Sequence, residues 1–154
     1  MKVYLVQHAE PKPKDEDPER PLSEKGEDDL KKMTSFLKGK GIRVGKILHS
    51  GKLRARQTAE IFSGVIDSGG VEEVEGLKAK DDPEFWGSKL KTGNEDVMLV
   101  GHLPHMGKLA GLLVADDSES NVINFQMGGV VCLTNENEEG SWSVHWMVTP
   151  QLLE

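Results

Sequence analysis

Apolar residues occur along this chain in two patterns, short continuous runs and stripes at helical spacing. Short apolar runs bounded by polar or glycine-containing segments are typical of buried strands, and an apolar residue every three or four positions is typical of an amphipathic helix. The predicted strands are Lys2–Val6, Lys46–His49, Val71–Glu75, Val97–Val100, Val122–Gln126, Val130–Thr134 and Trp142–Val148. The predicted helices are Glu24–Lys38, Leu53–Ile66, Asp81–Leu90 and Pro104–Val114.

Local signals mark where the first helix begins and ends. Ser23 is a favourable N-cap residue, and Gly39 and Gly41 are typical of a helix end. The segment Glu10–Pro21 before this helix contains several prolines and alternating charges, which predict a loop without regular structure.

The order of these elements predicts an α/β fold. Strands and helices alternate over the first two thirds of the chain, which indicates a mostly parallel sheet with helices on both faces, a three-layer α/β/α sandwich. The hairpin-like end of the chain would add antiparallel strands at one edge. In such sheets ligands bind outside the carboxyl ends of the strands.

Length and charge narrow the class of protein. With 154 residues, the chain is expected to form one domain over 1–154. The net charge of -7 argues against non-specific nucleic-acid binding, which depends on cationic side chains. Cys132 is the only cysteine, so no intrachain disulfide or cysteine-based zinc site is possible. No apolar signal segment or membrane-length run occurs, and we expect a cytoplasmic protein without a membrane partner.

Three predicted strands are followed by residues able to bind and attack phosphate. His8 follows the first strand, Arg54 comes shortly after the second, and His102 follows Val97–Val100. If these strands are neighbours, the three side chains face one crevice. Arginine binds phosphate oxygens with two parallel hydrogen bonds, one histidine could act as the nucleophile, and the other could stabilise the transition state. Ser50 could add a further donor.

Each of these residues alone also has an ordinary structural interpretation. A histidine at a strand end is usually a polar residue with a local partner, and an arginine on a helix is usually solvated. A metal site formed by His102 and His105, with His8 and Glu10 nearby, is a further alternative, although it would use the imidazoles that a phosphate site needs. The combination of three such residues at strand ends favours phosphate chemistry.

Four segments, taken in order, resemble the histidine phosphatase superfamily and, within it, the short SixA-type phosphohistidine phosphatases. The segments are QHA at 7–9, RPLSEKG at 20–26, SGKLRARQTA at 50–59 and GHLP at 101–104. The resemblance implies a phosphoglycerate mutase-like fold and no metal or organic cofactor. It also implies a substrate that is a phosphorylated protein, through phosphohistidine, or a small phosphate ester.

The resemblance assigns roles to individual residues. It implies that His8 is a nucleophile that is transiently phosphorylated, that Arg54 holds the phosphate and that His102 is the second histidine of the pocket. Glu10 is the nearest candidate in the sequence for a proton donor to the leaving group. Other acidic candidates are Asp81, Asp82 and Glu84, although a solvated cluster of charges is the simpler interpretation of these three. The loop Lys12–Glu19 is expected near the mouth of the pocket.

The sequence departs from the family pattern beside the expected nucleophile. Gln7 replaces an arginine, Ala9 replaces a glycine, and Gly51 stands where the family has a proline. A neutral amide can donate hydrogen bonds to phosphate, but these are weaker than those of a charged group. Three explanations stay open: Arg20 supplies the missing charge, the enzyme is slow or acts on a different substrate, or the chain binds phosphate or phosphohistidine without turnover. Phosphate-binding candidates are thus Gln7, Arg20, Ser50, Arg54 and His102.

Overall fold

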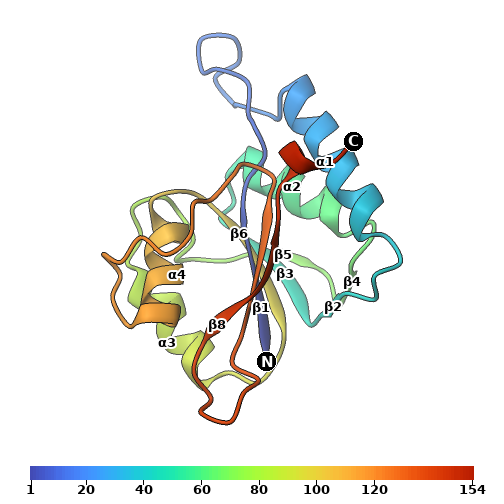
Figure 1. The fold of residues 1–154 in the computed structure, drawn as a ribbon. Coiled ribbons are helices and arrows are strands. Elements are labelled where there is room, and N and C mark those ends of the chain that lie inside the picture. Colours follow the sequence, from blue (N-terminus) through green and yellow to red (C-terminus); the bar gives the residue numbers. More distant parts are fainter.

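The strand β1 (Lys2–Gln7) lies inside a six-stranded sheet in the computed structural model, which describes residues 1–154 (Figure 1). The strand order is β5-β3-β6-β1-β7-β8, with β5, β3, β6 and β1 parallel and with β7 and β8 antiparallel at one edge. The other strands are β3 (Lys46–His49), β5 (Val71–Glu73), β6 (Val97–Gly101), β7 (Val130–Thr134) and β8 (Ser143–Val148). The predicted mostly parallel sheet with an antiparallel edge is confirmed.

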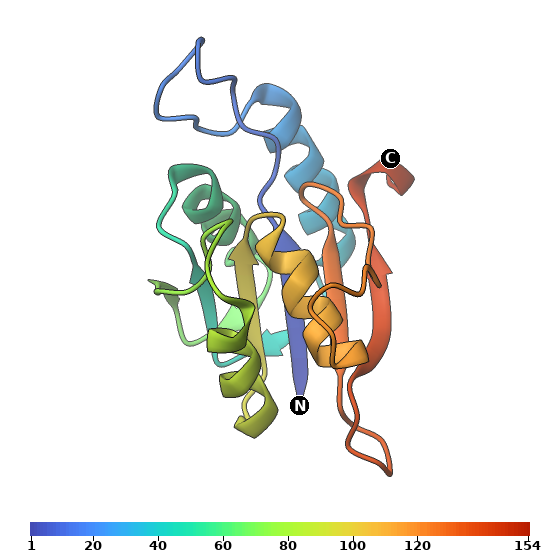
Figure 2. The ribbon, with the colours of Figure 1, turned by 90° about the vertical axis from the view of Figure 1, so that its left-hand side faces the viewer.

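Helices cover both faces of this sheet (Figures 1 and 2). The helices α1 (Glu24–Leu37) and α2 (Leu53–Phe62) pack on one face, and α3 (Pro83–Thr92) and α4 (His105–Ala115) pack on the other. Successive side chains of a strand point to opposite faces. Accordingly Tyr4 and Val6 of β1 belong to the core under α1 and α2, whereas Val3 and Leu5 belong to the core under α3 and α4.

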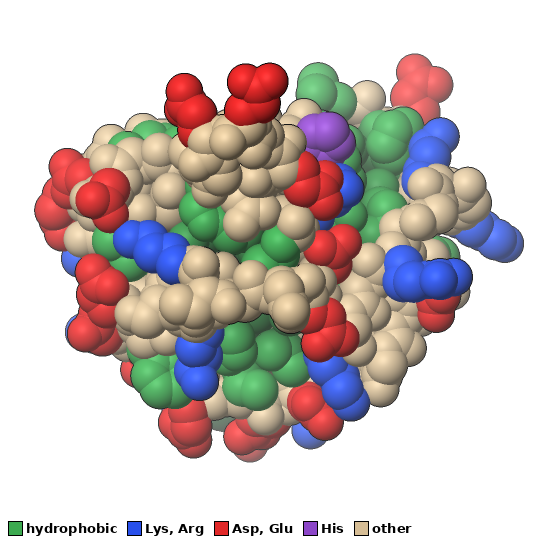
Figure 3. Space-filling view, turned by 90° about the horizontal axis from the view of Figure 1, so that it is seen from below, with side chains coloured by type: hydrophobic (Ala, Val, Ile, Leu, Met, Phe, Trp, Pro, Cys, Tyr) green, Lys and Arg blue, Asp and Glu red, His purple; other side chains and the backbone are tan.

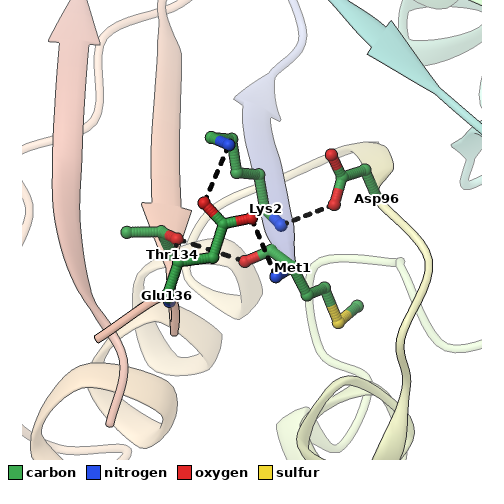
Figure 4. Close-up of polar contacts among 5 residues, drawn as sticks. All are labelled: Met1, Lys2, Asp96, Thr134 and Glu136. Carbon is green, nitrogen blue, oxygen red and sulfur yellow. Dashed lines mark hydrogen bonds and ion pairs between the residues drawn. The ribbon is translucent and has the colours of Figure 1, made fainter. Parts of the chain in front are cut away.

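Polar contacts fasten the beginning of β1 at the end of the sheet opposite the predicted crevice (Figure 4). The α-amino group of Met1 and the Nζ of Lys2 both bind Glu136, at 3.2 Å and 2.9 Å. The backbone N–H of Lys2 donates to Asp96 Oδ1 at 2.7 Å, and the hydroxyl of Thr134 donates to the carbonyl of Met1 at 3.3 Å. These contacts join β1 to the ends of β6 and β7 and so help to set its register.

The segment after β1 is tied to the first turn of α1. As predicted, Ser23 caps this helix, and its hydroxyl accepts a hydrogen bond from the N–H of Gly26 at 3.0 Å. The N–H of Ser23 donates to the carbonyl of Glu10 at 2.9 Å. The Cα of Gly26 lies so close to this carbonyl that a Cβ would collide with the backbone of Glu10. The rest of the loop 11–21 projects beyond the carboxyl ends of the parallel strands (Figure 1).

The predicted strand Val122–Gln126 is wrong, because this segment is irregular in the structure. The alternation that suggested a strand comes from Ile123 and Phe125, which are both buried in the core beneath α3 and α4. A strand also needs a neighbouring strand, and this segment pairs with none of the strands of the sheet. The segment therefore buries its apolar side chains without joining the sheet.

The second helix is shorter than predicted, since it ends at Phe62 rather than Ile66. Residues 63–66 form turns in which Ile66 still reaches the core. Two short strands, β2 (Arg43–Val44) and β4 (Asp67–Ser68), and the 3-10 helix η1 (Pro150–Leu152) were not predicted. The remaining predicted elements are confirmed to within two residues. None of the helices has the length and apolar character needed to cross a membrane.

Replacement of Gly26 by alanine is predicted to destabilise the protein, although alanine favours helix formation. The new Cβ would push α1 away from the backbone of Glu10, and overpacking of this kind costs about 1–3 kcal/mol. Gly107 is the matched control, since it is the third residue of α4, as Gly26 is of α1, and a Cβ there meets only Leu103 at 3.8 Å. We expect G107A to gain roughly 0.5–1 kcal/mol, as alanine does in a helix. Urea denaturation of both variants tests this, and equal effects would contradict it.

Candidate active site

Two histidines lie side by side at the carboxyl ends of β1 and β6. The register of these strands places Gln7 opposite Gly101, and the N–H of His8 donates to the carbonyl of Gly101 at 3.0 Å. His8 and His102 thus follow neighbouring strand ends, and their ring centroids are 4.9 Å apart with the planes tilted by 54°. Both side chains are nearly buried, at 8% and 3% exposure.

A local hydrogen bond sets the tautomer of His8. Its Nδ1 lies 2.8 Å from the carbonyl oxygen of Ala9, which can only accept a hydrogen bond. The proton of the neutral ring therefore sits on Nδ1, and Nε2 keeps a free lone pair. Imidazole nitrogens with a free lone pair are nucleophiles.

The hydroxyl of Ser50, between β3 and α2, contacts His102, and the guanidinium of Arg54 in α2 acts on the same ring through its charge. The Oγ of Ser50 lies 2.7 Å from Nε2 of His102. Arg54 is in the first turn of α2, and its Nε is buried without a hydrogen-bond partner. A buried N–H without a partner is costly, and an anion that accepts its hydrogen bond would remove this cost. Arg54 is therefore a donor available to a bound anion.

Thr58 connects α2 to the end of β1. Its hydroxyl accepts a hydrogen bond from the N–H of Ala9 at 3.0 Å and donates to the carbonyl of Arg54 at 2.8 Å. Ala9 itself has no positive φ, so its methyl group is compatible with the backbone there. The histidine after β1 is thus held against the helix that carries the arginine.

Burial and neighbouring cations keep both imidazoles neutral. Burial, together with the charges of Arg54 and Arg20, lowers the pKa of His8 to about 4. Burial also lowers the pKa of His102 to about 3, with contributions from His8, Arg54 and Lys52. Below neutrality, down to pH values near these pKa values, the pair stays uncharged and His8 keeps its nucleophilic lone pair.

Arg20 and Arg54, whose charges both act on His8, line one cleft of about 420 Å³. The Nε of Arg20 donates to the carbonyl of Lys12 at 3.2 Å, and Arg20 has a φ of 50°. A positive φ in a residue with a side chain costs about 1–2 kcal/mol, and such strain concentrates at functional sites. The other residues that line the cleft are Lys14, Pro18, Glu19, Gly51, Lys52 and Leu53. Three residues of the loop Lys12–Glu19 thus line the same cleft as Arg20 and Arg54.

Two other candidate residues have different surroundings. The Oε1 of Gln7 is buried without a partner, so rotation of its amide could present an N–H in the same position. Glu10 is partly buried, and its Oε2 accepts a hydrogen bond from the hydroxyl of Ser23 at 2.7 Å. The more distant acidic candidates have local structural roles, since Asp82 caps α3 and Asp81 accepts a hydrogen bond from the N–H of Lys78.

The sequence analysis missed three residues that belong to this region. Lys14 and Lys52 line the cleft, and Thr58 positions the backbone after His8. Lys52 could have been recognised as a residue of the cleft, because it lies only two residues before Arg54. His105, the alternative metal ligand, begins α4 and is fully buried, with no partner for either ring nitrogen. No group of three or more metal-ligating side chains occurs in the structure.

Comparisons with known proteins identify the family and the fold of the chain. Residues 3–81 match the Histidine phosphatase superfamily (branch 1). The chain is 25% identical to the phosphohistidine phosphatase SixA of Escherichia coli K12, over 97% of this chain and 94% of that protein. A structure of the protein histidine phosphatase SixA complexed with tungstate superimposes with a TM-score of 0.84 and 25% identity, over 100% of both chains. The α-ribazole phosphatase from Shigella flexneri shares the fold, with a TM-score of 0.75, 12% identity and 97% coverage of both chains.

The buried imidazole of His105 predicts a loss of stability in acid. Burial lowers its pKa below 6.5, although the charges of Asp81 and Asp82 oppose this shift. Above about pH 6.5 the ring is neutral in both the folded and the unfolded chain, so it adds no pH dependence. As the pH falls below this value, the unfolded chain takes up the proton first, and the folded state loses stability.

We predict that His105→Leu raises the free energy of unfolding by about 1 kcal/mol at pH 7.5, because it removes unpaired buried polar atoms. The gain over the natural chain should grow at pH 5, where His105 would otherwise destabilise the folded state. Urea denaturation at both pH values measures this, with the exposed His145→Ala as the control. A destabilised variant at pH 7.5 would mean that the imidazole has a partner.

Proposed function

Because this chain belongs to branch 1 of the histidine phosphatase superfamily and its similarity to SixA indicates a phosphatase, we propose that it hydrolyses phosphohistidine, or a related phosphate monoester, with His8 as the nucleophile. The observation that carries this proposal is the free lone pair on Nε2 of His8, beside His102 and Arg54. The substrate is a phosphorylated protein, and no metal or organic cofactor takes part.

In the first step Nε2 of His8 attacks phosphorus in line with the leaving group. The N–P bond to His8 forms as the bond to the leaving group breaks, and His8 carries the phosphoryl group. The guanidinium of Arg54 holds equatorial oxygens through paired hydrogen bonds, which position the group and stabilise its charge. His102, with Ser50 at 2.7 Å, donates to another oxygen.

In the second step water attacks the phosphoryl group on His8. The bond between Nε2 and phosphorus breaks, inorganic phosphate leaves, and the lone pair returns to His8. The carbonyl of Ala9 accepts from Nδ1–H at 2.8 Å and stabilises the positive charge that the phosphorylated ring carries. This contact lets the ring act as a leaving group without a change of tautomer.

The leaving group also needs a proton. The imidazole of a substrate phosphohistidine departs as a neutral ring if its second nitrogen is already protonated, and no separate acid is then required. Departure of an alkoxide from a phosphate ester would need an acid, and Glu10 is the candidate in the chain. Its Oε2 accepts a hydrogen bond from the hydroxyl of Ser23, so a proton on Oε2 would displace this hydrogen bond.

Arg20 is proposed to supply the charge that Gln7 lacks. Its charge acts on both His8 and Arg54, and it lines the same cleft as Arg54. Its strained backbone supports a functional position. Arg20 comes from the loop before α1 rather than from β1, so the second cation approaches the phosphate from a different side.

The absence of the family arginine at position 7 favours one competing function, a module that binds phosphate or phosphohistidine without turnover. The loss of one donor to a developing charge costs about 3–4 kcal/mol of barrier in measured cases. A cost of this size would leave binding intact while turnover falls by a few hundred-fold. Assays of turnover and of phosphate binding on the same preparation distinguish the two functions.

We predict that His8→Ala abolishes phosphate release from a phosphohistidine-bearing protein and from an aryl phosphate, because no nucleophile remains. The matched control is His145→Ala, since His145 is exposed on β8 and should leave turnover unchanged. A natural chain that binds phosphate but releases none would support the binding module. Full activity of His8→Ala would exclude His8 as the nucleophile.

We further predict that Arg20→Gln lowers kcat by about a hundredfold or more, as the loss of a donor to transition-state charge does. Addition of Gln7→Arg to this variant should recover most of the loss, because the new guanidinium would reach the same phosphoryl group from β1. Arg43→Gln serves as the control, since Arg43 is exposed and pairs with Asp67 at 2.8 Å. Unchanged kcat in Arg20→Gln would rule out compensation by Arg20.

A further inference from the structure

The cleft lined by Arg20 and Arg54 gathers cations that form no ion pairs. Lys14, Arg20, Lys52 and Arg54 all line it, and none of the four forms an ion pair with a carboxylate. The chain carries 26 acidic and 19 basic side chains, so an unpaired basic cluster runs against its composition. At the opposite end of the molecule, acidic side chains spread over the surface with Lys and Arg between them (Figure 3). Since the four cations repel one another, the cluster points to an anion.

The four cations lie at two depths. Arg20 and Arg54 are partly buried, whereas Lys14 and Lys52 are exposed. The charge of Arg20 acts on His8 and that of Lys52 acts on His102, so the cluster extends outward from the imidazole pair. Lys14 comes from the loop after β1, and Lys52 immediately precedes α2. The two lysines are thus carried on separate segments that flank the mouth of the cleft.

One phosphoryl group does not account for all of this charge. A phosphoryl group that carries two negative charges is balanced by the two guanidinium groups, which leaves both lysines without an anion. Two carboxylates lie nearby, since Glu19 lines the same cleft and the carboxylate of Glu73 packs against Gly51. Neither pairs with a lysine. Among the residues that line the cleft, the two lysines thus outnumber Glu19 once a phosphoryl group balances the two arginines.

We propose that Lys14 and Lys52 form a second anion subsite that recognises acidic side chains next to the phosphorylated residue of a protein substrate. This inference rests on the proposed function. Lysine ammonium groups are flexible point charges, which suits carboxylates at variable positions on a peptide better than the fixed geometry of one phosphate. Because the subsite is exposed, it contributes more to selection among substrates and to the rate of encounter than to the chemical step.

Two phosphohistidine peptides of equal length test this subsite. One carries glutamate and the other glutamine on both sides of the phosphohistidine, and the selectivity is the ratio of their kcat/KM values. We expect the natural chain to prefer the glutamate peptide. Lys14→Gln and Lys52→Gln should each lower this ratio by about threefold, and the double variant by about tenfold, as expected for exposed ion pairs. The preference should also fade as the salt concentration rises, since salt screens exposed charges.

The control is Lys32→Gln, because Lys32 is exposed on α1, outside the cleft, and should leave the ratio unchanged. If the double variant loses activity equally on both peptides, the lysines act on the phosphoryl group itself and the subsite is excluded. An equal ratio in the natural chain and the double variant would also overturn the proposal.

Failure of the proposed function can be separated from failure of the subsite. If the natural chain hydrolyses neither peptide, the phosphatase mechanism fails. The subsite is then tested by measuring how tightly each peptide binds to the natural chain and to the double variant. Tighter binding of the glutamate peptide that disappears in the double variant supports the subsite without turnover. No preference in the binding assay overturns it.

Discussion

The parallel pairing of β1 with β6, which places Gln7 opposite Gly101, determines the position of both histidines. A strand shifted by one residue would turn its side chains to the other face of the sheet. The interleaved burial of Val3 and Leu5 on one face and of Tyr4 and Val6 on the other makes such a shift costly. The contacts of Met1 and Lys2 with the ends of β6 and β7 hold the same register from the opposite end of the strand. The chemistry at one end of β1 thus depends on packing along its whole length.

Desolvation shapes the electrostatics of the site more strongly than any single pair of charges. Burial is the largest cause of the lowered pKa of both His8 and His102, and the nearby guanidinium groups act in the same direction. Neutral buried imidazoles do not add to the positive charge of the nearby guanidinium groups. A bound anion would accept the hydrogen bonds that these partly buried groups no longer make to water. The Nε of Arg54 also suits a bound anion, because its buried N–H has no acceptor within the protein.

The loop between β1 and α1 links the stability of the fold to the site. Its first residues are held by Thr58 and by the cap of α1, and its last part contains Arg20 with a positive φ. Because both ends of the loop are fixed by hydrogen bonds to helices, the strained arginine is kept in place beside the cleft. The same loop carries Lys14 to the outer part of the cleft. Substitutions in this loop can therefore change substrate preference without a change in the sheet.

The sequence by itself determined the fold class, the positions of His8 and His102 directly after strands and of Arg54 in the first turn of a helix, and the cap of α1, because periodicity and capping are local properties of the chain. It did not reveal that Val122–Gln126 stays outside the sheet, since that depends on how Ile123 and Phe125 pack against residues far along the chain. The tautomer of His8, the positive φ of Arg20 and the presence of Lys14 and Lys52 in one cleft also became visible only in the tertiary structure. Each depends on atoms from segments that the chain brings together only when the sheet closes, and no local pattern encodes such distances.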